Sequence, residues 1–197
     1  MTNTILGLLR HGQTDWNIDF RLQGTTDIPL NTNGIQQARQ AGAHIFRGDW
    51  DVLLSSPLGR AMETARIVAE VAGFPEAVVE QLLVERAFGE AEGLTYGEYR
   101  ERYPDGTAVP GGETIPELAS RATLLLQHIV NTYPGQRVLA VSHGAFIRKA
   151  IRLASDKTLP LEGERFGNAS LSSLIHSDRW RILNYAPHTL GTANRSS

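Results

Sequence analysis

An alternation of short apolar runs with longer segments of helical spacing constrains the fold of this chain more than any other feature. Residues 5–9 (Ile-Leu-Gly-Leu-Leu) form a continuous apolar run that ends at Arg10. Such a run predicts a strand that is buried on both faces, which is typical of a parallel sheet covered by helices. Residues 51–55, 78–84 and 138–141 predict three more strands. The chain therefore predicts a mainly parallel sheet.

The segments between these strands place their apolar residues on one side of a helix. Ser56 suits an N-cap and Pro57 the first helical turn, and Gly73 closes the same helix. Residues 170–176 and 180–185 predict a closing pair of strands. The predicted helices cover residues 33–47, 57–72, 96–103, 115–132 and 145–154. This order predicts an α/β fold, a three-layer α/β/α sandwich with a mainly parallel sheet and an antiparallel edge strand.

Length and composition indicate one globular domain. The chain has 197 residues, of which 41% are hydrophobic and 20% are charged, and these values exclude disordered and fibrous classes of protein. We expect a single domain over residues 1–197, in which residues 187–197 form a frayed tail. The formal net charge is −2, so the chain has no overall positive charge to attract nucleic acid or an anionic membrane. We expect neither as a partner.

The chain contains no cysteine, which excludes disulfides, thiolate metal sites and a cysteine nucleophile. The first four residues, Met-Thr-Asn-Thr, lack the charged region of a signal peptide, and the apolar run at 5–9 is too short for a membrane span. We therefore expect a cytoplasmic protein.

Residues that suit phosphate chemistry follow each of the four predicted strands. They are Arg10 and His11, then Arg60, then Glu85, and finally His143. Since the carboxyl ends of parallel strands share one edge of a sheet, we expect these side chains to converge. Arginine binds phosphate oxygens bidentately, neutral imidazole can attack phosphorus, and a carboxylic acid can protonate the departing alkoxide. Amides at the starts of the two following helices also favour an anion, so the set predicts a phosphoryl-transfer site without metal.

Only the joint placement of these residues favours a site, because each of them alone is more often structural. A single Arg-His-Gly tripeptide occurs by chance, and Arg60, Glu85 or His143 alone is more often a packed or an exposed residue. The chain lacks the G-x-S-x-G, H-E-x-x-H, G-x-x-x-x-G-K-[ST] and G-x-G-x-x-G patterns. These absences argue against a serine hydrolase, a zinc site, a P-loop and a dinucleotide site. We therefore expect neither a metal nor a cofactor.

The same residues belong to an extended set of motifs. Residues 8–17 read Leu-Leu-Arg-His-Gly-Gln-Thr-Asp-Trp-Asn. The motifs that follow are Arg21-Leu-Gln-Gly24, Asp27-Ile-Pro-Leu30, Ser55-Ser-Pro-Leu-Gly-Arg-Ala61, Glu85-Arg-Ala-Phe-Gly89, Pro110-Gly-Gly-Glu113 and Val141-Ser-His-Gly144. Their order and spacing, over residues 6–168, resemble the histidine phosphatase superfamily in its phosphoglycerate-mutase-like branch. Within that branch the chain is most similar to the broad-specificity bacterial phosphatases.

The resemblance implies a role for each of the residues that follow the strands. His11 looks like the nucleophile that becomes phosphohistidine, while Arg10, Arg60 and His143 look like the groups that hold the phosphoryl oxygens. Glu85 resembles the acid that protonates the leaving oxygen and then activates water. The substrate-binding residues that the resemblance implies are Arg10, His11, Asn17, Gln23, Gly24, Arg60, Glu85 and His143. Arginine and histidine would do the electrostatic work that Mg²⁺ does in kinases, so the resemblance implies no metal.

Phosphatases and mutases of this family share these residues, so both activities remain as alternatives. A mutase needs a lid and extra cations, and residues 93–112 offer only Arg100 and Arg102, although Glu85-Arg86-Ala-Phe-Gly89 is typical of mutases. We favour a metal-independent phosphomonoester phosphatase over a cofactor-dependent phosphoglycerate mutase, and either of them over a non-catalytic phosphate-binding module. The expected partner is a small phosphomonoester whose carboxylate meets Arg86 or Arg100. We expect a monomer or a homodimer.

Overall fold

The computed structural model describes residues 3–104 and 107–186 of the chain. Six strands form one sheet in the order β3-β2-β4-β1-β5-β6. The strands are β1 (Thr4–Arg10), β2 (Val52–Ser55), β3 (Val78–Val79), β4 (Arg137–Ser142), β5 (Leu171–His176) and β6 (Trp180–Asn184). Strands β1 to β4 are parallel, whereas β5 runs antiparallel to both of its neighbours, β1 and β6. The predicted sheet is confirmed, and the predicted tail, residues 187–197, lies outside the described residues.

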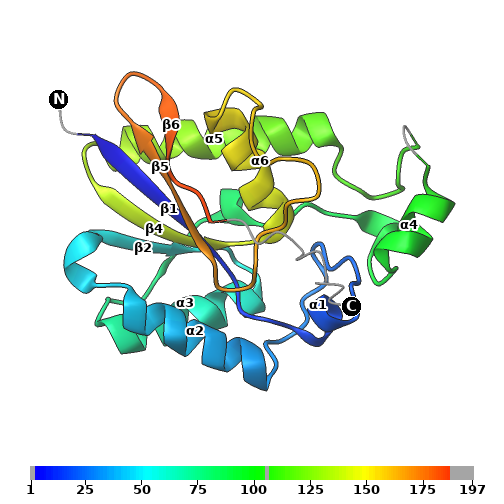
Figure 1. Cartoon of the computed structure of the whole chain (residues 1–197), viewed down its shortest axis with the longest axis horizontal. Coiled ribbons are helices and arrows are strands. Elements are labelled where there is room, and N and C mark those ends of the chain that lie inside the picture. The colour runs from blue at the N-terminus through cyan, green and yellow to red at the C-terminus, as the bar shows by residue number, and fades with distance from the viewer. Residues whose placement is uncertain (1–2, 105–106, 187–197) are drawn as a thin grey trace, which may run out of the picture.

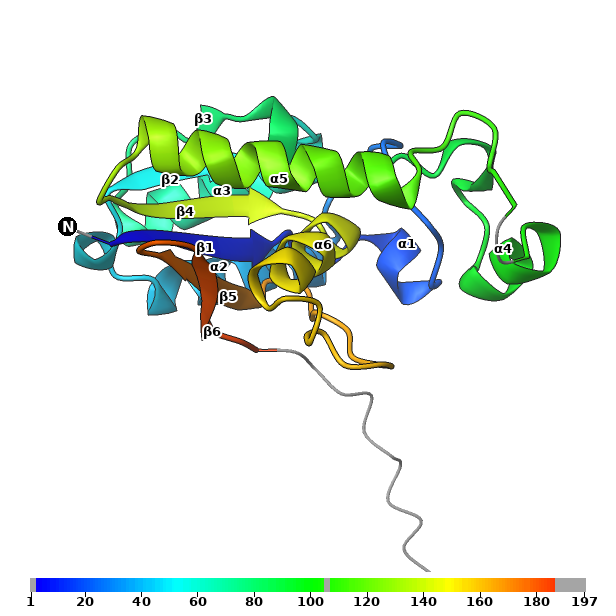
Figure 2. The same ribbon diagram turned by 90° about the horizontal axis from the view of Figure 1, so that it is seen from above.

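Helices cover both faces of this sheet and complete the predicted three layers (Figure 1). One face carries α2 (Thr32–His44) and α3 (Gly59–Ala72), and the other carries α5 (Ile115–Thr132) and α6 (Gly144–Ala154). Figure 2 shows α1 (Asp15–Ile18) and α4 (Tyr96–Arg102) beyond the carboxyl ends of the parallel strands. Short 3₁₀ helices occupy Arg47–Asp49, Gln81–Leu83 and Gly89–Ala91. No helix of the described ranges has the length and apolar character that crossing a membrane requires.

The central strands are buried on both faces, as their continuous apolar runs predict. On β1, Leu6 and Leu8 pack into the core formed with α5 and α6, while Leu9 packs into the core formed with α2 and α3. On β4, Ala140 and Leu139 divide between the two cores in the same way. This alternation follows from the two-residue period of a strand. Because β1, β2 and β4 are parallel, the polar residues that follow them lie at the same end of this buried part of the sheet.

The start of α3 differs from the prediction. We expected Ser56 to cap a helix beginning at Pro57, but α3 begins at Gly59. A carboxylate from a distant loop caps it instead, because Asp27 accepts hydrogen bonds from the backbone N–H groups of Gly59 and Arg60. The Ser56 hydroxyl lies 2.7 Å from Nε2 of His143. The prediction that Ser56 caps this helix was wrong because the Asp27 carboxylate, a charged acceptor, takes the place of the Ser56 hydroxyl.

The third predicted strand is also much shorter than expected. Residues 78–84 were predicted as one strand, but β3 contains only Val78 and Val79. The Glu80 carboxylate accepts a hydrogen bond from the N–H of Leu82 at 2.9 Å and caps the 3₁₀ helix that follows. This local side-chain bond competes with the sheet ladder and turns the chain out of the sheet. Glu85 therefore stands on a segment that follows the end of β3 and lies outside its parallel backbone ladder.

Candidate active site

The register of β1 and β4 brings two histidines side by side. Arg10 and Ser142 are partners in this parallel pair, so the next residues, His11 and His143, leave the sheet at the same edge. Their ring centroids lie 5.1 Å apart, and both side chains are buried. This pair forms the centre of the candidate site.

The ring of His11 has a defined tautomer. Its Nδ1 lies 2.7 Å from the carbonyl oxygen of Gly12, and a carbonyl oxygen can only accept, so Nδ1 carries the proton. The Nε2 atom therefore keeps a free lone pair. The N–H of Gly12 donates to Oγ1 of Thr64 at 3.0 Å, and a Cβ at position 12 would collide with the carbonyl of Gly34. Glycine at position 12 lets this corner pack closely against α2, and its carbonyl fixes the His11 ring through the hydrogen bond from Nδ1.

Both imidazoles are held neutral. Burial lowers the pKa of His11 well below 6.5, and the charges of Arg10 and Arg60 lower it further. Burial also lowers the pKa of His143 well below 6.5, and His11 and the same two arginines add to the effect. At neutral pH His11 thus presents an unprotonated Nε2, which is the form that can act as a nucleophile.

Arg60 is buried at the start of α3, with a relative exposure of 1%. Its Nη2 donates to the carbonyl of Gly24 at 2.7 Å and its Nη1 to the carbonyl of Thr26 at 2.8 Å. Gly24 has a φ of 57°, a left-handed conformation that glycine adopts without strain. Burial lowers the pKa of Arg60, and the nearby charges of Glu85 and Asp27 oppose this shift. The loop carbonyls fix the guanidinium group.

Arg10 reaches the same point from the end of β1. Its Nη1 donates to the carbonyl of Phe166. Burial lowers the pKa of Arg10 to about 10, an effect that Glu85 opposes and Arg60 increases. Two guanidinium groups and a carboxylate therefore interact electrostatically around the histidine pair.

Three nitrogen atoms of this cluster are buried without a hydrogen-bond partner among residues 3–104 and 107–186. They are Arg10 Nε, Arg60 Nε and His143 Nδ1. Buried polar atoms are nearly always paired, so three such nitrogens beside one imidazole indicate a ligand that carries several acceptor oxygens. Gln23 Oε1 is also unpaired, and rotation of that amide would present a donor instead. The set fits a phosphoryl group.

Glu85 is 8% exposed and lies against the N-terminus of α6. Its Oε1 accepts hydrogen bonds from the N–H groups of Arg86 at 2.8 Å and Phe146 at 2.9 Å, and its Oε2 accepts one from Ala145 at 3.0 Å. Each carboxylate oxygen can accept two such bonds, so Oε2 retains an unused lone pair. The carboxylate is therefore fixed by three backbone donors and keeps one free position.

Carboxylates of the chain itself occupy the two helix N-termini that we expected to attract an anion. Glu85 binds the first amides of α6, and Asp27 binds those of α3. The helix amides at Gly59, Arg60, Ala145 and Phe146 are therefore already paired. The positive side chains and His143 Nδ1 remain as the groups that could hold an anion, which corrects the predicted use of the helix dipoles.

The predicted accessory residues Asn17, Gln23 and Gly24 lie near this cluster. The structure adds Asn168, a supporting residue that was not predicted. Nδ2 of Asn168 donates both to the carbonyl of His11 at 3.1 Å and to Oδ1 of Asn17 at 3.0 Å. Gln23 is buried, and the carbonyl of Gly24 binds Arg60. Asn168 stands 157 positions from His11, so no local sequence signal links the two residues.

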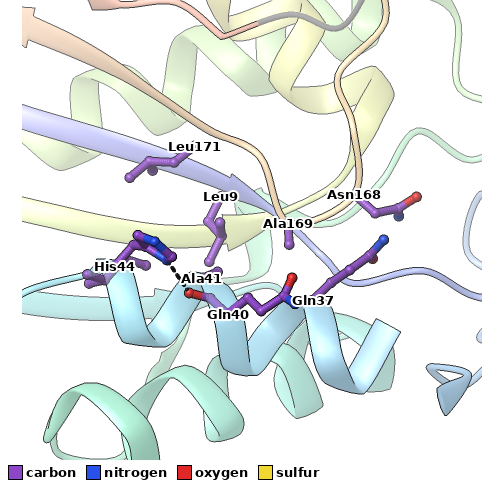
Figure 3. Close-up of a pocket in the computed structure, with 9 residues that line it drawn as sticks. Leu9, Gln37, Gln40, Ala41, His44, Asn168, Ala169 and Leu171 are labelled. Carbon is purple, nitrogen blue, oxygen red and sulfur yellow. Dashed lines mark hydrogen bonds between the residues drawn. The ribbon is translucent and has the colours of Figure 1, made fainter. Parts of the chain in front are cut away.

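Asn168 also lines a pocket of about 370 Å³ between α2 and the segment that precedes β5 (Figure 3). Asn168 and Gln37 lie toward one end of this pocket and His44 toward the other. The two histidines, two arginines and glutamate of the candidate site do not line it. Across residues 3–104 and 107–186, no three histidine, aspartate or glutamate side chains are grouped so as to hold a metal ion.

The neutral histidines predict a loss of stability in mild acid. Below pH 6.5 the unfolded chain protonates these residues while the folded chain does not, so the unfolded state binds more protons. The free energy of unfolding should then fall with falling pH, by about 1.4 kcal/mol per pH unit for each of His11 and His143, down to their lowered pKa values. Urea unfolding at several pH values measures this slope. A His143→Asn variant should lose about half of the histidine contribution, and an unchanged slope would contradict the assignment.

Comparison with known proteins agrees with this geometry. The histidine phosphatase superfamily (branch 1) pattern matches residues 6–186. The uncharacterized phosphatase PhoE of Bacillus subtilis is 39% identical over 183 residues, which cover 92% of this chain and 94% of that protein. The probable phosphoglycerate mutase GpmB of Serratia proteamaculans is 34% identical over 198 residues, which cover 93% and 91%. A solved mycobacterial glucosyl-3-phosphoglycerate phosphatase has a TM-score of 0.78 and 30% identity, over 92% of this chain and 98% of that one. The chain belongs to the histidine phosphatase superfamily.

Proposed function

We propose that the protein is a metal-independent phosphomonoester phosphatase that acts through a phosphohistidine at His11. The observation that carries this proposal is the free Nε2 lone pair of a neutral His11 beside three buried nitrogens that lack a partner among the described residues. An entering phosphoryl group would supply the missing acceptors. Family membership and a phosphatase among the relatives support the same activity.

In the first step, Nε2 of His11 forms a bond to phosphorus while the bond from phosphorus to the ester oxygen breaks. The leaving oxygen takes a proton from Glu85, which enters the step as a carboxylic acid. Oε2 is the oxygen with room for that proton, because it accepts only one backbone hydrogen bond. The products of the step are a free alcohol, a phosphohistidine and a Glu85 carboxylate.

In the second step, water attacks the phosphohistidine. The water oxygen bonds to phosphorus, the phosphorus–nitrogen bond breaks, and Nε2 of His11 regains its lone pair. Glu85 takes the proton that the water loses and is again a carboxylic acid. Phosphate leaves, and the enzyme returns to its starting state.

The arginines and His143 stabilise the charge on the phosphoryl oxygens in both steps. The guanidinium groups are fixed by carbonyls before substrate enters, so little reorganisation is required. For Nδ1 of His143 to donate to a phosphoryl oxygen, the Ser56 hydroxyl must donate to its Nε2, and the 2.7 Å distance between these atoms suits that bond. Ser56 would then select the tautomer of His143.

A phosphate-release assay distinguishes the phosphatase from a mutase. The enzyme is incubated in EDTA with phosphoserine, 3-phosphoglycerate and a panel of other phosphomonoesters, and 2-phosphoglycerate is followed in the same samples. We expect phosphate release that EDTA leaves unchanged and that requires His11. Fast isomerisation with little phosphate would make the protein a mutase, and neither product would favour a phosphate-binding module.

Arg86 is the better candidate to recognise a carboxylate on the substrate. Its Nε donates to the carbonyl of Glu113 at 2.9 Å and its guanidinium lies 4.9 Å from the centre of the Phe88 ring, so the group is held beside Glu85. Arg100 lies exposed on α4. The glucosyl-3-phosphoglycerate phosphatase among the solved relatives is named for a substrate that bears a carboxylate. We therefore propose small, carboxylated phosphomonoesters as the substrate class.

This substrate class predicts a selective effect of Arg86→Ala. The substitution should lower kcat/KM about tenfold or more for phosphoserine, because a charge-assisted hydrogen bond contributes about 1.5–3 kcal/mol. It should change kcat/KM for an uncarboxylated alkyl phosphate much less. Arg100→Ala is the matched control and should preserve the ratio. If Arg86→Ala leaves the ratio of the two substrates unchanged, the carboxylate preference is wrong.

A further inference from the structure

The segment that carries Glu85 is held by hydrogen bonds from side chains rather than by a backbone ladder of the sheet. β3 ends at Val79, and the chain then turns through the 3₁₀ helix Gln81–Leu83. The carbonyl of Leu83 accepts a hydrogen bond from Oγ of Ser142 at 2.8 Å. The other carbonyls of this segment therefore also need donors from outside it, since buried backbone groups must be paired.

One guanidinium group supplies those donors. Nη1 of Arg121, on α5, donates to the carbonyls of Leu82 at 2.9 Å and Val84 at 2.6 Å. Nη2 of the same side chain donates to the carbonyl of Glu85 at 3.4 Å. Arg121 thus does for this segment what a neighbouring strand does for an ordinary strand.

Glu113 fixes the guanidinium group of Arg121. Its two carboxylate oxygens bind Nε at 2.8 Å and Nη2 at 2.7 Å, and both side chains are only 16% exposed. All five N–H groups of Arg121 are then in use. The guanidinium also lies 5.1 Å from the centre of the Phe146 ring, and the backbone N–H of Phe146 binds Oε1 of Glu85. Arg121 therefore contacts the backbone of Glu85 and one of the residues that hold its carboxylate.

Glu113 also contacts the residues that follow Glu85. Its N–H donates to the carbonyl of Ala87 at 2.8 Å, and its own carbonyl accepts the hydrogen bond from Nε of Arg86. Glu113 closes the Pro110-Gly-Gly-Glu113 motif, to which the proposed reaction gives no role. The motif and Arg121 together hold residues 85–87 from two sides.

We propose that Arg121, held by Glu113, is a positioning residue for Glu85 in the transfer of the proton to the leaving group. The inference rests on the proposed function, in which Glu85 acts as acid and base. Arg121 does not touch the reacting atoms. It fixes the backbone from which the carboxyl group reaches the leaving oxygen, whereas the attack of His11 on phosphorus depends on other elements. Removing the contacts of Arg121 or Glu113 should therefore impair protonation of the leaving group more than phosphoryl transfer itself.

The test uses Arg121→Gln and Glu113→Gln with two substrates that differ in their need for an acid. An alkyl phosphate needs its leaving oxygen protonated, whereas 4-nitrophenyl phosphate has a good leaving group and needs little help. A small misplacement of a catalytic group can cost about 100-fold, so we expect kcat/KM to fall about 10-fold to 100-fold for the alkyl phosphate. We expect a change of less than about threefold for 4-nitrophenyl phosphate under the same reasoning. Glu113→Gln, the milder change, should act in the same direction.

Arg137→Gln is the matched control. Arg137 makes a more exposed ion pair with Asp51, at 3.1 Å, at the start of β4 and therefore at the opposite end of the parallel strands. This variant should keep the ratio of the two substrates. Urea unfolding of each variant confirms that the assays contain folded enzyme, and Glu113→Gln alone decides the question if Arg121→Gln does not fold.

Two results would overturn the proposal, and they differ in what else they overturn. Equal losses on both substrates, or no loss on either, in a folded Arg121→Gln or Glu113→Gln variant would make Arg121 and Glu113 purely structural. This conclusion leaves the proposed function intact if Glu85→Gln still discriminates between the substrates. If Glu85→Gln itself does not discriminate, the acid role of Glu85 fails and the positioning role fails with it.

Discussion

Replacing His11 with alanine is expected to abolish phosphate release and the acid-labile phosphorylation of the protein together. Loss of a catalytic nucleophile costs about 10⁴-fold or more in rate, which is the size of effect expected here. The reason is the free Nε2 of the neutral His11 ring, which belongs to the same cluster as the three nitrogens that lack a partner among residues 3–104 and 107–186. Rapid quenching of the enzyme with a radiolabelled phosphomonoester measures the intermediate, and phosphate release measures turnover.

His44→Ala is the matched control for this experiment. His44 lies exposed on α2, and its Nδ1 hydrogen bonds to the carbonyl of Gln40 within the same helix. This variant should keep full activity and full labelling. If labelling instead persists in His11→Ala and disappears in His143→Ala, the nucleophile is His143 and the proposed roles of the two rings are reversed.

The fold could be predicted where local signals agree with one another. α5 begins and ends where the sequence predicts, at Ile115 and Thr132. Thr114 and Glu117 form a capping box at its start, and Pro134 with Gly135 follows its end. The closing pair of strands was predicted for the same reason, since a turn separates two apolar runs. Such elements depend on residues close in sequence, so the chain alone specifies them.

Prediction failed where a distant side chain decided the outcome. Asp27 caps α3 from 32 positions away, in place of the adjacent Ser56. Residues 81–84 leave the sheet, and Arg121, 37 positions from Val84, supplies donors to the carbonyls of this segment. Neither contact can be inferred from the local pattern of apolar residues.

The candidate site follows the same division. Arg10, His11 and His143 could be proposed as neighbours because parallel strands deliver their carboxyl ends to one edge. The contacts that hold these residues in place could not be predicted, because Asn168 reaches His11 only in the completed fold. Sequence patterns thus predict which groups take part in the proposed chemistry, and the structure adds the contacts that fix these groups.

Glu85→Gln is expected to separate the two proton transfers of the proposed reaction. Glutamine cannot donate a proton as an acid, so kcat/KM for alkyl phosphates should fall by about 10² to 10⁴. The value for 4-nitrophenyl phosphate should fall by less than about tenfold, since kcat/KM ends at departure of the leaving group and this group needs little protonation. In the second step, hydrolysis of the phosphohistidine, the variant lacks the base whichever substrate is used. The variant should therefore release a burst of about one equivalent of nitrophenol, followed by slow turnover and accumulation of phosphohistidine.

The substitution also has a structural effect that the burst experiment takes into account. The three backbone N–H groups of Arg86, Ala145 and Phe146 all point at Glu85, and the amide nitrogen of glutamine cannot accept from any of them. We expect a loss of about 1–2 kcal/mol in the free energy of unfolding, as for removal of a helix cap. A burst of full amplitude would show that the folded site still attacks phosphorus and that only proton transfer is lost. Equal losses on both substrates without a burst would reduce Glu85 to a cap of α6 and would remove the acid from the proposed mechanism.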